Sequence, residues 1–200
     1  MLRRQRLPPK LLRRRGVFAA SEASAAGVHP QKLARLVKQG AVERVSRGKY
    51  RQAGAEVTEH HGLALAAASV PKGVVCLLSA LRFHDVTTQN PFAVWLAIEH
   101  RSRAPKLEYP PLRIVRFSGR AFTSGVETHV IEGERVRVYS LAKTIADLFK
   151  YRNKVGVNVA VEALRESWQS RKIRPSEIDP YSRICRVQRV MRPYLEALIG

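Results

Sequence analysis

The stretch HPQKLARLVKQGAVERVSRGKYR, residues 29–51, decides how the N-terminal part of the chain folds. Pro30 suits the first turn of a helix, where its missing N–H removes no hydrogen bond. Leu33 and Leu36 recur at the spacing of one apolar helical face. Gly40 can adopt the positive φ at which many helices end. The stretch therefore predicts a helix that begins at the proline and ends at the glycine.

Short elements are expected on both sides of this helix. Residues 19–26 are rich in alanine and predict a brief helix that ends at Gly27. Residues 42–51 predict a β-hairpin with a tight turn, and Val17-Phe18 predicts a short strand that pairs with it. Two helices joined at a glycine and followed by a basic hairpin predict a winged helix-turn-helix, a motif that binds DNA.

Long polar side chains lie off the apolar face of the main helix, and such a helix can enter a major groove and contact base edges. A basic hairpin beside it can bind phosphates. We expect base contacts from Gln31, Lys32 and Arg35, and phosphate contacts from Lys38, Arg44, Arg47 and Lys49. The alternative is a small helical domain whose basic face is merely solvated.

The charge of the chain favours a polyanionic partner. It holds 36 Lys and Arg against 16 Asp and Glu, a formal charge of +20. Residues 1–52 have 14 basic and 2 acidic residues, and residues 1–15 alone suggest a basic arm along DNA. No apolar run is long enough for a membrane span, no secretory signal is visible, and the two cysteines form no motif. We expect a cytoplasmic protein that binds no membrane.

The rest of the chain predicts a mixed-sheet α+β domain with a C-terminal helical bundle. Residues 52–56 form a small-residue linker, so we expect domains at 1–55 and 56–200. Residues 93–98 and 112–117 predict strands, and 126–139 a hairpin. From Ser140 the apolar period becomes helical. There the expected inward residues are Leu141, Ile145 and Leu148, and the expected residues of the opposite side are Lys143, Asp147 and Lys150.

Several segments resemble the AbiEi family, antitoxins of type IV toxin–antitoxin (abortive infection) systems. They are LARLVKQGAVERVSRGKYR at 33–51, LLSAL at 77–81, YPPLR at 109–113 and SLAKTIAD at 140–147. The resemblance implies an antitoxin that neutralises a co-encoded nucleotidyltransferase-like toxin without a stable complex. It also implies repression of the chain's own promoter at inverted repeats, by a protein that is a monomer in solution and binds DNA as two copies.

No catalytic set, cofactor motif or metal-binding spacing is apparent, so we expect neither an enzyme nor a bound cofactor. A nuclease remains an alternative through Asp85 and Glu99-His100-Arg101, although arginine replaces the usual lysine. A generic nucleic-acid-binding protein is a second alternative. Lys143 and Asp147 predict an i,i+4 ion pair, with a partner contact as the alternative reading. Arg186 and Arg189 are candidates for a second partner surface.

Overall fold

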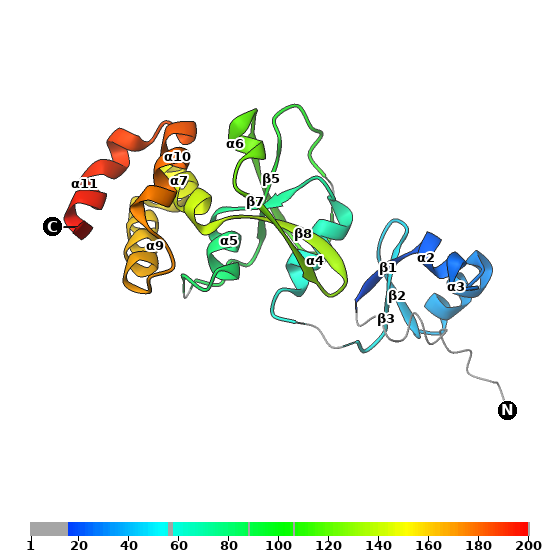
Figure 1. The fold of residues 1–200 in the computed structure, drawn as a ribbon. Coiled ribbons are helices and arrows are strands. Elements are labelled where there is room, and N and C mark those ends of the chain that lie inside the picture. The colour runs from blue at the N-terminus through cyan, green and yellow to red at the C-terminus, as the bar shows by residue number, and fades with distance from the viewer. Residues whose placement is uncertain (1–15, 56–57, 88, 106, 200) are drawn as a thin grey trace. The chain divides into compact units, whose positions relative to one another are not determined.

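The computed structural model describes residues 16–55, 58–87, 89–105 and 107–199, so the expected basic arm at 1–15 lies outside the described residues. The fold is α+β with two sheets, as the sequence predicted (Figure 1). The chain forms two compact units. Unit 1 comprises Met1–Pro71 with His129–Val136, and unit 2 comprises Lys72–Thr128 with Arg137–Gly200. Among the described helices, none is long and apolar enough to cross a membrane.

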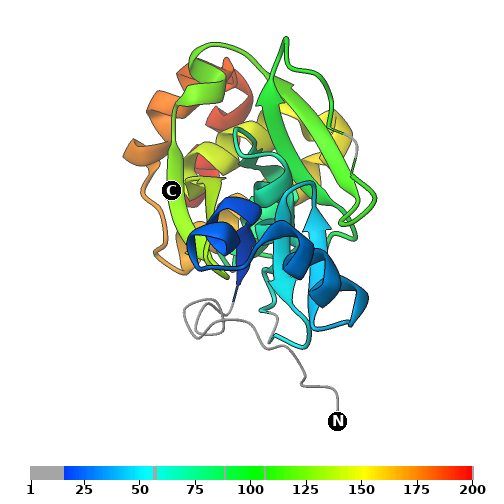
Figure 2. The ribbon, with the colours of Figure 1, turned by 90° about the vertical axis from the view of Figure 1, so that its right-hand side faces the viewer.

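Unit 1 places two short helices on a small antiparallel sheet of order β1-β3-β2 (Figure 2). Its elements are β1 (Val17–Ala19), α2 (Ala20–Ala25), α3 (Pro30–Lys38), β2 (Val42–Ser46), β3 (Lys49–Gln52) and α4 (His61–Ser69). The pairing of β1 with β3 confirms the predicted short strand, because Phe18 lies opposite Tyr50. A core of six buried side chains joins the helices to the sheet: Phe18, Ala23, Val28, Leu33, Leu36 and Val42.

Helix α4 belongs to unit 1, although the sequence suggested a domain boundary after residue 55. Its buried Leu65 and Ala68 form a second small cluster with Val17 of β1, and Val45 of β2 packs against that cluster. The helix begins at His61. The compact units therefore divide after Pro71, and the earlier boundary stays a prediction about function.

Unit 2 is built on a five-stranded sheet of order β6-β5-β4-β8-β7. Its strands are β4 (Val74–Val75), β5 (Val94–Glu99) and β6 (Leu112–Phe117), with the hairpin of β7 (Val126–Ile131) and β8 (Glu134–Tyr139), whose tip belongs to unit 1. Strand β4 pairs antiparallel with β5 and parallel with β8, and β5 pairs parallel with β6. The strands at 94–99 and 112–117 and the hairpin confirm the predicted elements.

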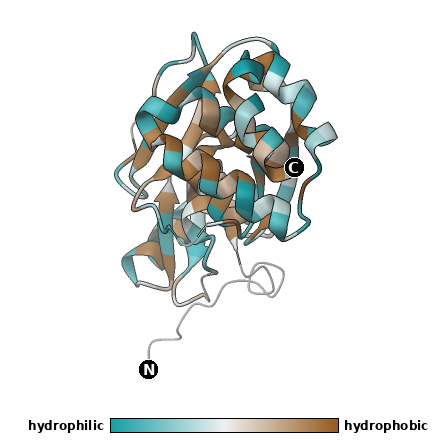
Figure 3. Ribbon diagram, turned by 90° about the vertical axis from the view of Figure 1, so that its left-hand side faces the viewer, coloured by the Kyte–Doolittle hydropathy of each residue, from teal (hydrophilic) through white to brown (hydrophobic). Residues whose placement is uncertain are grey.

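Helices pack against this sheet and turn their hydrophobic residues inward (Figure 3). They are α5 (Leu77–Phe83), α6 (Arg120–Thr123), α7 (Leu141–Lys150), α8 (Arg152–Val155), α9 (Val157–Gln169), α10 (Pro175–Cys185) and α11 (Gln188–Ile199). In α9 the buried residues include Ala160, Ala163 and Leu164, whereas Val157 is 38% exposed.

Helix α7 is the most deeply buried helix of unit 2, and it corrects one prediction. Ser140 caps it, because its hydroxyl accepts the Lys143 N–H at 3.3 Å. Lys143 and Asp147, however, are fully buried and not on a solvent-facing side. The Lys143 Nζ lies 2.5 Å from the Asp147 Oδ2 and 4.3 Å from the centroid of the Tyr139 ring. The Cys185 thiol, from α10, donates to the other oxygen of Asp147 at 3.1 Å.

Candidate nucleic-acid interface

Glycines end the two helices α2 and α3, and they fix the direction of the chain before and after α3. Gly27 follows α2 with φ +80°, and Gly40 follows α3 with φ +68°. In both, the residue after the glycine donates back to the carbonyl five positions earlier: Val28 N–H to Ala23 O at 2.8 Å, and Ala41 N–H to Leu36 O at 3.0 Å. This hydrogen bond, with the accompanying apolar contact, is the Schellman arrangement, which ends a helix at a fixed direction. The local sequence thus fixes both turns.

The outer face of α3 carries three of the side chains predicted to contact DNA. Gln31, Arg35 and Lys38 are spaced by three or four residues, share one side of the helix and are exposed. Leu33 and Leu36 lie on the opposite side and are buried. Lys32 lies on the flank and is half-buried. The face that meets solvent is therefore polar and basic.

The hairpin of β2 and β3 presents cations beside this helix, although not all those predicted. Arg44 in β2 and Arg47 in the turn are exposed. Gly48 closes the turn with φ +75°. Lys49, in contrast, donates from its Nζ to both carboxylate oxygens of Glu134, at 2.9 and 3.1 Å. Lys49 is thus paired with Glu134 within unit 1. A phosphate would have to compete with Glu134 for its ammonium group.

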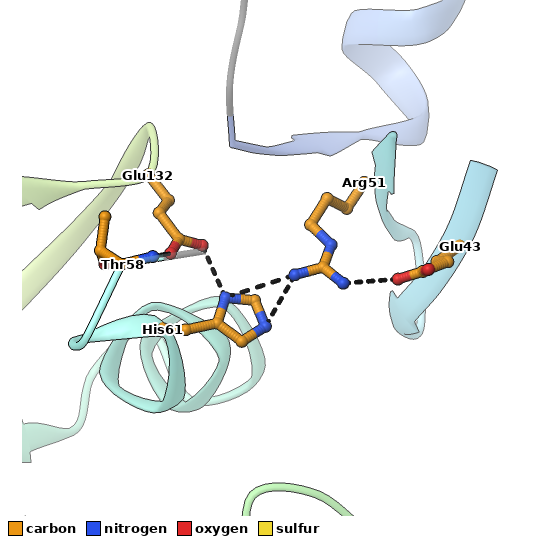
Figure 4. A network of polar contacts seen from close by, with 5 residues as sticks. All are labelled: Glu43, Arg51, Thr58, His61 and Glu132. Carbon is orange, nitrogen blue, oxygen red and sulfur yellow. Dashed lines mark hydrogen bonds and ion pairs between the residues drawn. The ribbon is translucent and has the colours of Figure 1, made fainter. Parts of the chain in front are cut away.

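A polar network holds the last strand of the hairpin in place (Figure 4). Arg51 in β3 donates to Glu43, its cross-strand neighbour in β2, at 2.5 Å. Its other terminal nitrogen lies 2.8 Å from the Nε2 of His61. The Nδ1 of His61 lies 2.6 Å from Glu132, at the tip of the β7–β8 hairpin. Glu132 also accepts the N–H of Thr58 at 2.8 Å.

The chemistry of the partners indicates which groups in the network donate. Arginine is a donor only, so the Nε2 of His61 accepts from Arg51, and its Nδ1–H donates to Glu132. Burial raises the pKa of the Glu132 carboxyl, but its bonds to Thr58 and His61 outweigh this and leave the pKa below its ordinary value. Glu132 thus stays ionised.

Sequence reasoning missed most of this network. The Glu43–Arg51 pair had a signal, because a hairpin turning at residues 46–48 places these two side chains opposite one another. The contacts of Glu132 with His61 and Thr58 had none, since 71 and 74 positions separate the residues in the chain. Arg51 pairs with Glu43 and Lys49 pairs with Glu134, so Arg44 and Arg47 remain as the exposed cations of the hairpin.

The candidate residues of unit 2 occupy different surroundings. Neither Lys143 nor Asp147 has exposed area, so neither can contact a partner while unit 2 keeps this structure. Arg186 and Arg189 are exposed, and their role in binding a partner stays a prediction.

Of the nuclease candidates, Glu99 accepts the N–H of Arg101 at 2.8 Å. Asp85 forms an ion pair with Arg82 at 3.8 Å. In the described ranges, no three His, Cys, Asp or Glu side chains gather as a metal site would need.

The chain is similar in structure to the RV2827C protein from Mycobacterium tuberculosis, at a TM-score of 0.63 and 13% sequence identity. The match covers 88% of this chain and 69% of that chain, and at such identity it shows a shared fold. No match is found among curated proteins. Residues 5–52, which include α2, α3 and the hairpin, match the sequence model described as "Transcriptional regulator, AbiEi antitoxin". The likeness to the AbiEi antitoxin family of transcriptional regulators therefore covers the segment that forms α2, α3 and the β2–β3 hairpin.

Proposed function

We propose that this chain is a transcriptional regulator that binds duplex DNA through a winged helix-turn-helix formed by α2, α3 and the β2–β3 hairpin. The observation that carries the proposal is the exposed basic face of α3, held by two Schellman turns over a buried apolar face. Helix α3 lies in the major groove, where Gln31, Lys32 and Arg35 contact base edges. The phosphates are bound by Lys38, Arg44 and Arg47.

The proposed site is the chain's own promoter. Two copies of a chain that is a monomer in solution bind inverted repeats, since the symmetry of paired half-sites matches that of two proteins. The support is the match of residues 5–52 to a family described as antitoxins and transcriptional regulators. Repression of its own operon follows from occupancy of that promoter.

The second part of the proposal is antitoxin activity carried by residues 56–200. The toxin is a co-encoded nucleotidyltransferase-like protein, and neutralisation does not need a stable complex with it. This division of labour rests on the antitoxin description of the family and on the packed α+β body that follows the DNA-binding segment. A regulatory protein of this kind needs no catalytic centre of its own.

The test of DNA binding uses the full chain and a labelled fragment of the promoter upstream of its gene. Affinity is measured by fluorescence anisotropy over a series of salt concentrations, against a fragment of shuffled sequence. We expect preference for the promoter and a steep loss of affinity with salt, because cations on the protein displace counterions from DNA. Equal affinity for both fragments would favour the generic nucleic-acid-binding alternative.

The test of antitoxin activity is growth rescue. The adjacent gene product is expressed alone, with the full chain, and with an Arg35→Ala/Arg47→Ala chain. We expect both chains to restore growth, since the antitoxin activity is assigned to residues outside the DNA-binding face. Failure of the parent chain to restore growth would remove the antitoxin half of the proposal and leave the regulator half standing.

A further inference from the structure

Positively charged side chains gather in unit 2 where strands β5 and β6 end, and the proposed function does not use them. Arg101 and Arg103 lie exposed in the segment that follows β5, and Arg116 is exposed near the end of β6. The two strands run parallel, and Glu99 lies beside Phe117 in their last pair. Parallel pairing therefore brings the two arginine-bearing strand ends to the same end of the sheet.

The guanidinium of Arg116 joins these two segments. Its Nη1 donates to the carbonyls of His100 and Ser102, at 2.8 and 2.6 Å. These bonds fix the backbone on both sides of Arg101. The segment after β5 is therefore held against the end of β6, although its arginine side chains are exposed.

Two lysines reach the same place from α7 and α8. The Lys150 Nζ lies 5.9 Å from the centroid of the Phe117 ring, and the Lys154 Nζ lies 5.7 Å from that of Tyr151. The centroids of the two rings are 5.4 Å apart, and the Tyr151 hydroxyl donates to the carbonyl of Arg116 at 3.2 Å. Because cations are attracted to aromatic faces, this pair of rings holds both ammonium groups beside the arginines.

The strand-end cluster consists of Arg101, Arg103, Arg116, Lys150 and Lys154, all of them exposed. None of the five forms an ion pair with a carboxylate of the described chain. The acidic residue at this end of the strands is Glu99, which is half-buried and accepts the N–H of Arg101 at 2.8 Å. Five positive charges against one negative charge leave a surplus that attracts an anionic partner.

The composition of the strand-end cluster favours duplex DNA over a protein or a single strand. Protein interfaces have an apolar centre in which charged residues are depleted. Single strands are held largely by bases that stack on exposed rings. Phe117 is 2% exposed, and Tyr151 is half-buried and contacts both Phe117 and Lys154, so neither ring is an open platform. A duplex backbone needs neither feature, because cations alone neutralise its phosphates.

We propose that the strand-end cluster binds the phosphate backbone of duplex DNA and gives unit 2 its own contact with DNA. The inference rests on the proposed function in one respect, namely that DNA is the partner of the chain. Arg101, Arg103 and the two lysines contact phosphates, and Arg116 positions the segment that carries the first two. Each phosphate contact releases counterions, so the cluster adds to the salt dependence of binding and leaves sequence preference to α3.

The test uses the full chain, a long promoter duplex, a duplex of shuffled sequence and a single strand of the promoter. Arg103→Gln and Lys150→Gln each remove one charge, and they are tested singly and together. Arg103→Lys and Lys150→Arg keep the charge at the same positions. Arg165→Gln removes an exposed charge of α9 outside the cluster. Fluorescence anisotropy over a salt series gives the affinities, and thermal unfolding shows that each variant is folded.

We expect each single glutamine variant to reduce the slope of log affinity against log salt by about one unit on both duplexes, and the double variant by about two. The charge-preserving variants and Arg165→Gln should keep the slope of the parent. The ratio of promoter affinity to shuffled-sequence affinity should match that of the parent in every variant.

Parent-like slopes for Arg103→Gln and Lys150→Gln on both duplexes overturn the proposal. If these two variants then also fail to restore growth against the adjacent gene product, the strand-end cluster contacts a protein instead. Weakening confined to the single strand overturns the proposal as well. The proposed function is judged separately, from the parent chain: equal affinity for the two duplexes removes promoter recognition, whereas a slope reduced by the glutamine variants still supports the strand-end cluster.

Discussion

Arg35 is an exposed cation in the middle of α3, on the side opposite the buried leucines. If it contacts a base, its loss should depend on sequence. We expect Arg35→Ala to weaken binding to the promoter by about 1–3 kcal/mol and to relax the preference at the contacted base pair. Competition with single-base variants of the promoter measures both effects. An unchanged preference at every position would remove Arg35 from the groove.

Arg47 tests the other half of the interface. It lies in the turn of the hairpin and is exposed, so its expected contact is a phosphate. We expect Arg47→Ala to weaken binding to all sequences alike and to reduce the slope of log affinity against log salt by about one unit. The matched control is Arg165→Ala, an exposed arginine of α9 in unit 2. If both variants gave the slope of the parent, the hairpin would not contact the DNA backbone.

Glu132 gives unit 1 a defined dependence on pH. Burial raises the pKa of its carboxyl, but the bonds from Thr58 and His61 prevail, so the folded-state pKa lies below the ordinary value of 4.5. A carboxyl of lowered pKa stabilises the fold above its ordinary pKa, and that stability is lost as the pH falls through the folded value. We expect Glu132→Gln to unfold at a lower denaturant concentration than the parent at pH 7. The difference between the two unfolding midpoints should narrow below pH 4.5. A midpoint difference that stayed constant with pH would contradict an ionised Glu132 carboxyl in the folded protein.

At the scale of single elements, α7 depends on its buried ion pair. Removing one charge of such a pair leaves the other in the core without its counter-charge, at a cost of about 3–5 kcal/mol. We expect Lys143→Met to lower the free energy of unfolding by about this amount, since Asp147 has no exposed area. The double variant Lys143→Met/Asp147→Leu should recover much of the loss. Denaturant unfolding of the three proteins gives both values, and a double variant no better than the single one would contradict this account.

Two glycines distinguish a conformational requirement from a steric one. Gly27 has φ +80° with open space around it, so Gly27→Ala should cost about 1–2 kcal/mol for the left-handed backbone. A Cβ on Gly16 would lie 1.3 Å from the carbonyl oxygen of Glu132. We expect Gly16→Ala to destabilise unit 1 far more than Gly27→Ala, and thermal unfolding compares them. Equal melting temperatures for the two variants would show that this backbone contact does not form.

Local patterns predicted the elements well where the hydrophobic period decides the structure. The period of the leucines and the two terminal residues, Pro30 and Gly40, fixed α3, and with it the exposed side of the candidate site. The same reasoning placed Lys143 and Asp147 on the solvent-exposed side of their helix, because charged residues usually avoid the core. Their burial depends on Cys185 and Tyr139, which reach α7 from other elements. A local pattern contains no information about such tertiary partners.

At the scale of the whole molecule, unit 1 is not a continuous segment of the chain. The tip of the β7–β8 hairpin contributes Glu132 and Glu134, which bind His61 and Lys49. The backbone of Glu132 also accepts the N–H of Val17 at 3.0 Å. No sequence period marks these contacts, so the sequence suggested a self-contained N-terminal domain ending at residue 55.

We therefore expect a fragment of residues 1–55 to lose stability, since it lacks both α4 and the hairpin tip. Circular dichroism during heating should show a broad, low-temperature transition for the fragment and a cooperative one for the full chain. The comparison fragment, residues 1–71, restores α4 and should recover part of the difference. A fragment of 1–55 that melts cooperatively near the temperature of the full chain would show that the later segments are dispensable.

The late position of Glu132 also orders events during synthesis. Residues 16–55 leave the ribosome early, but the carboxylate and the carbonyl that complete their packing are translated only after more than half of the chain. A nascent polypeptide would thus have an incompletely packed N-terminal unit until the β7–β8 hairpin emerges. DNA recognition would begin only when most of the remaining body has been made.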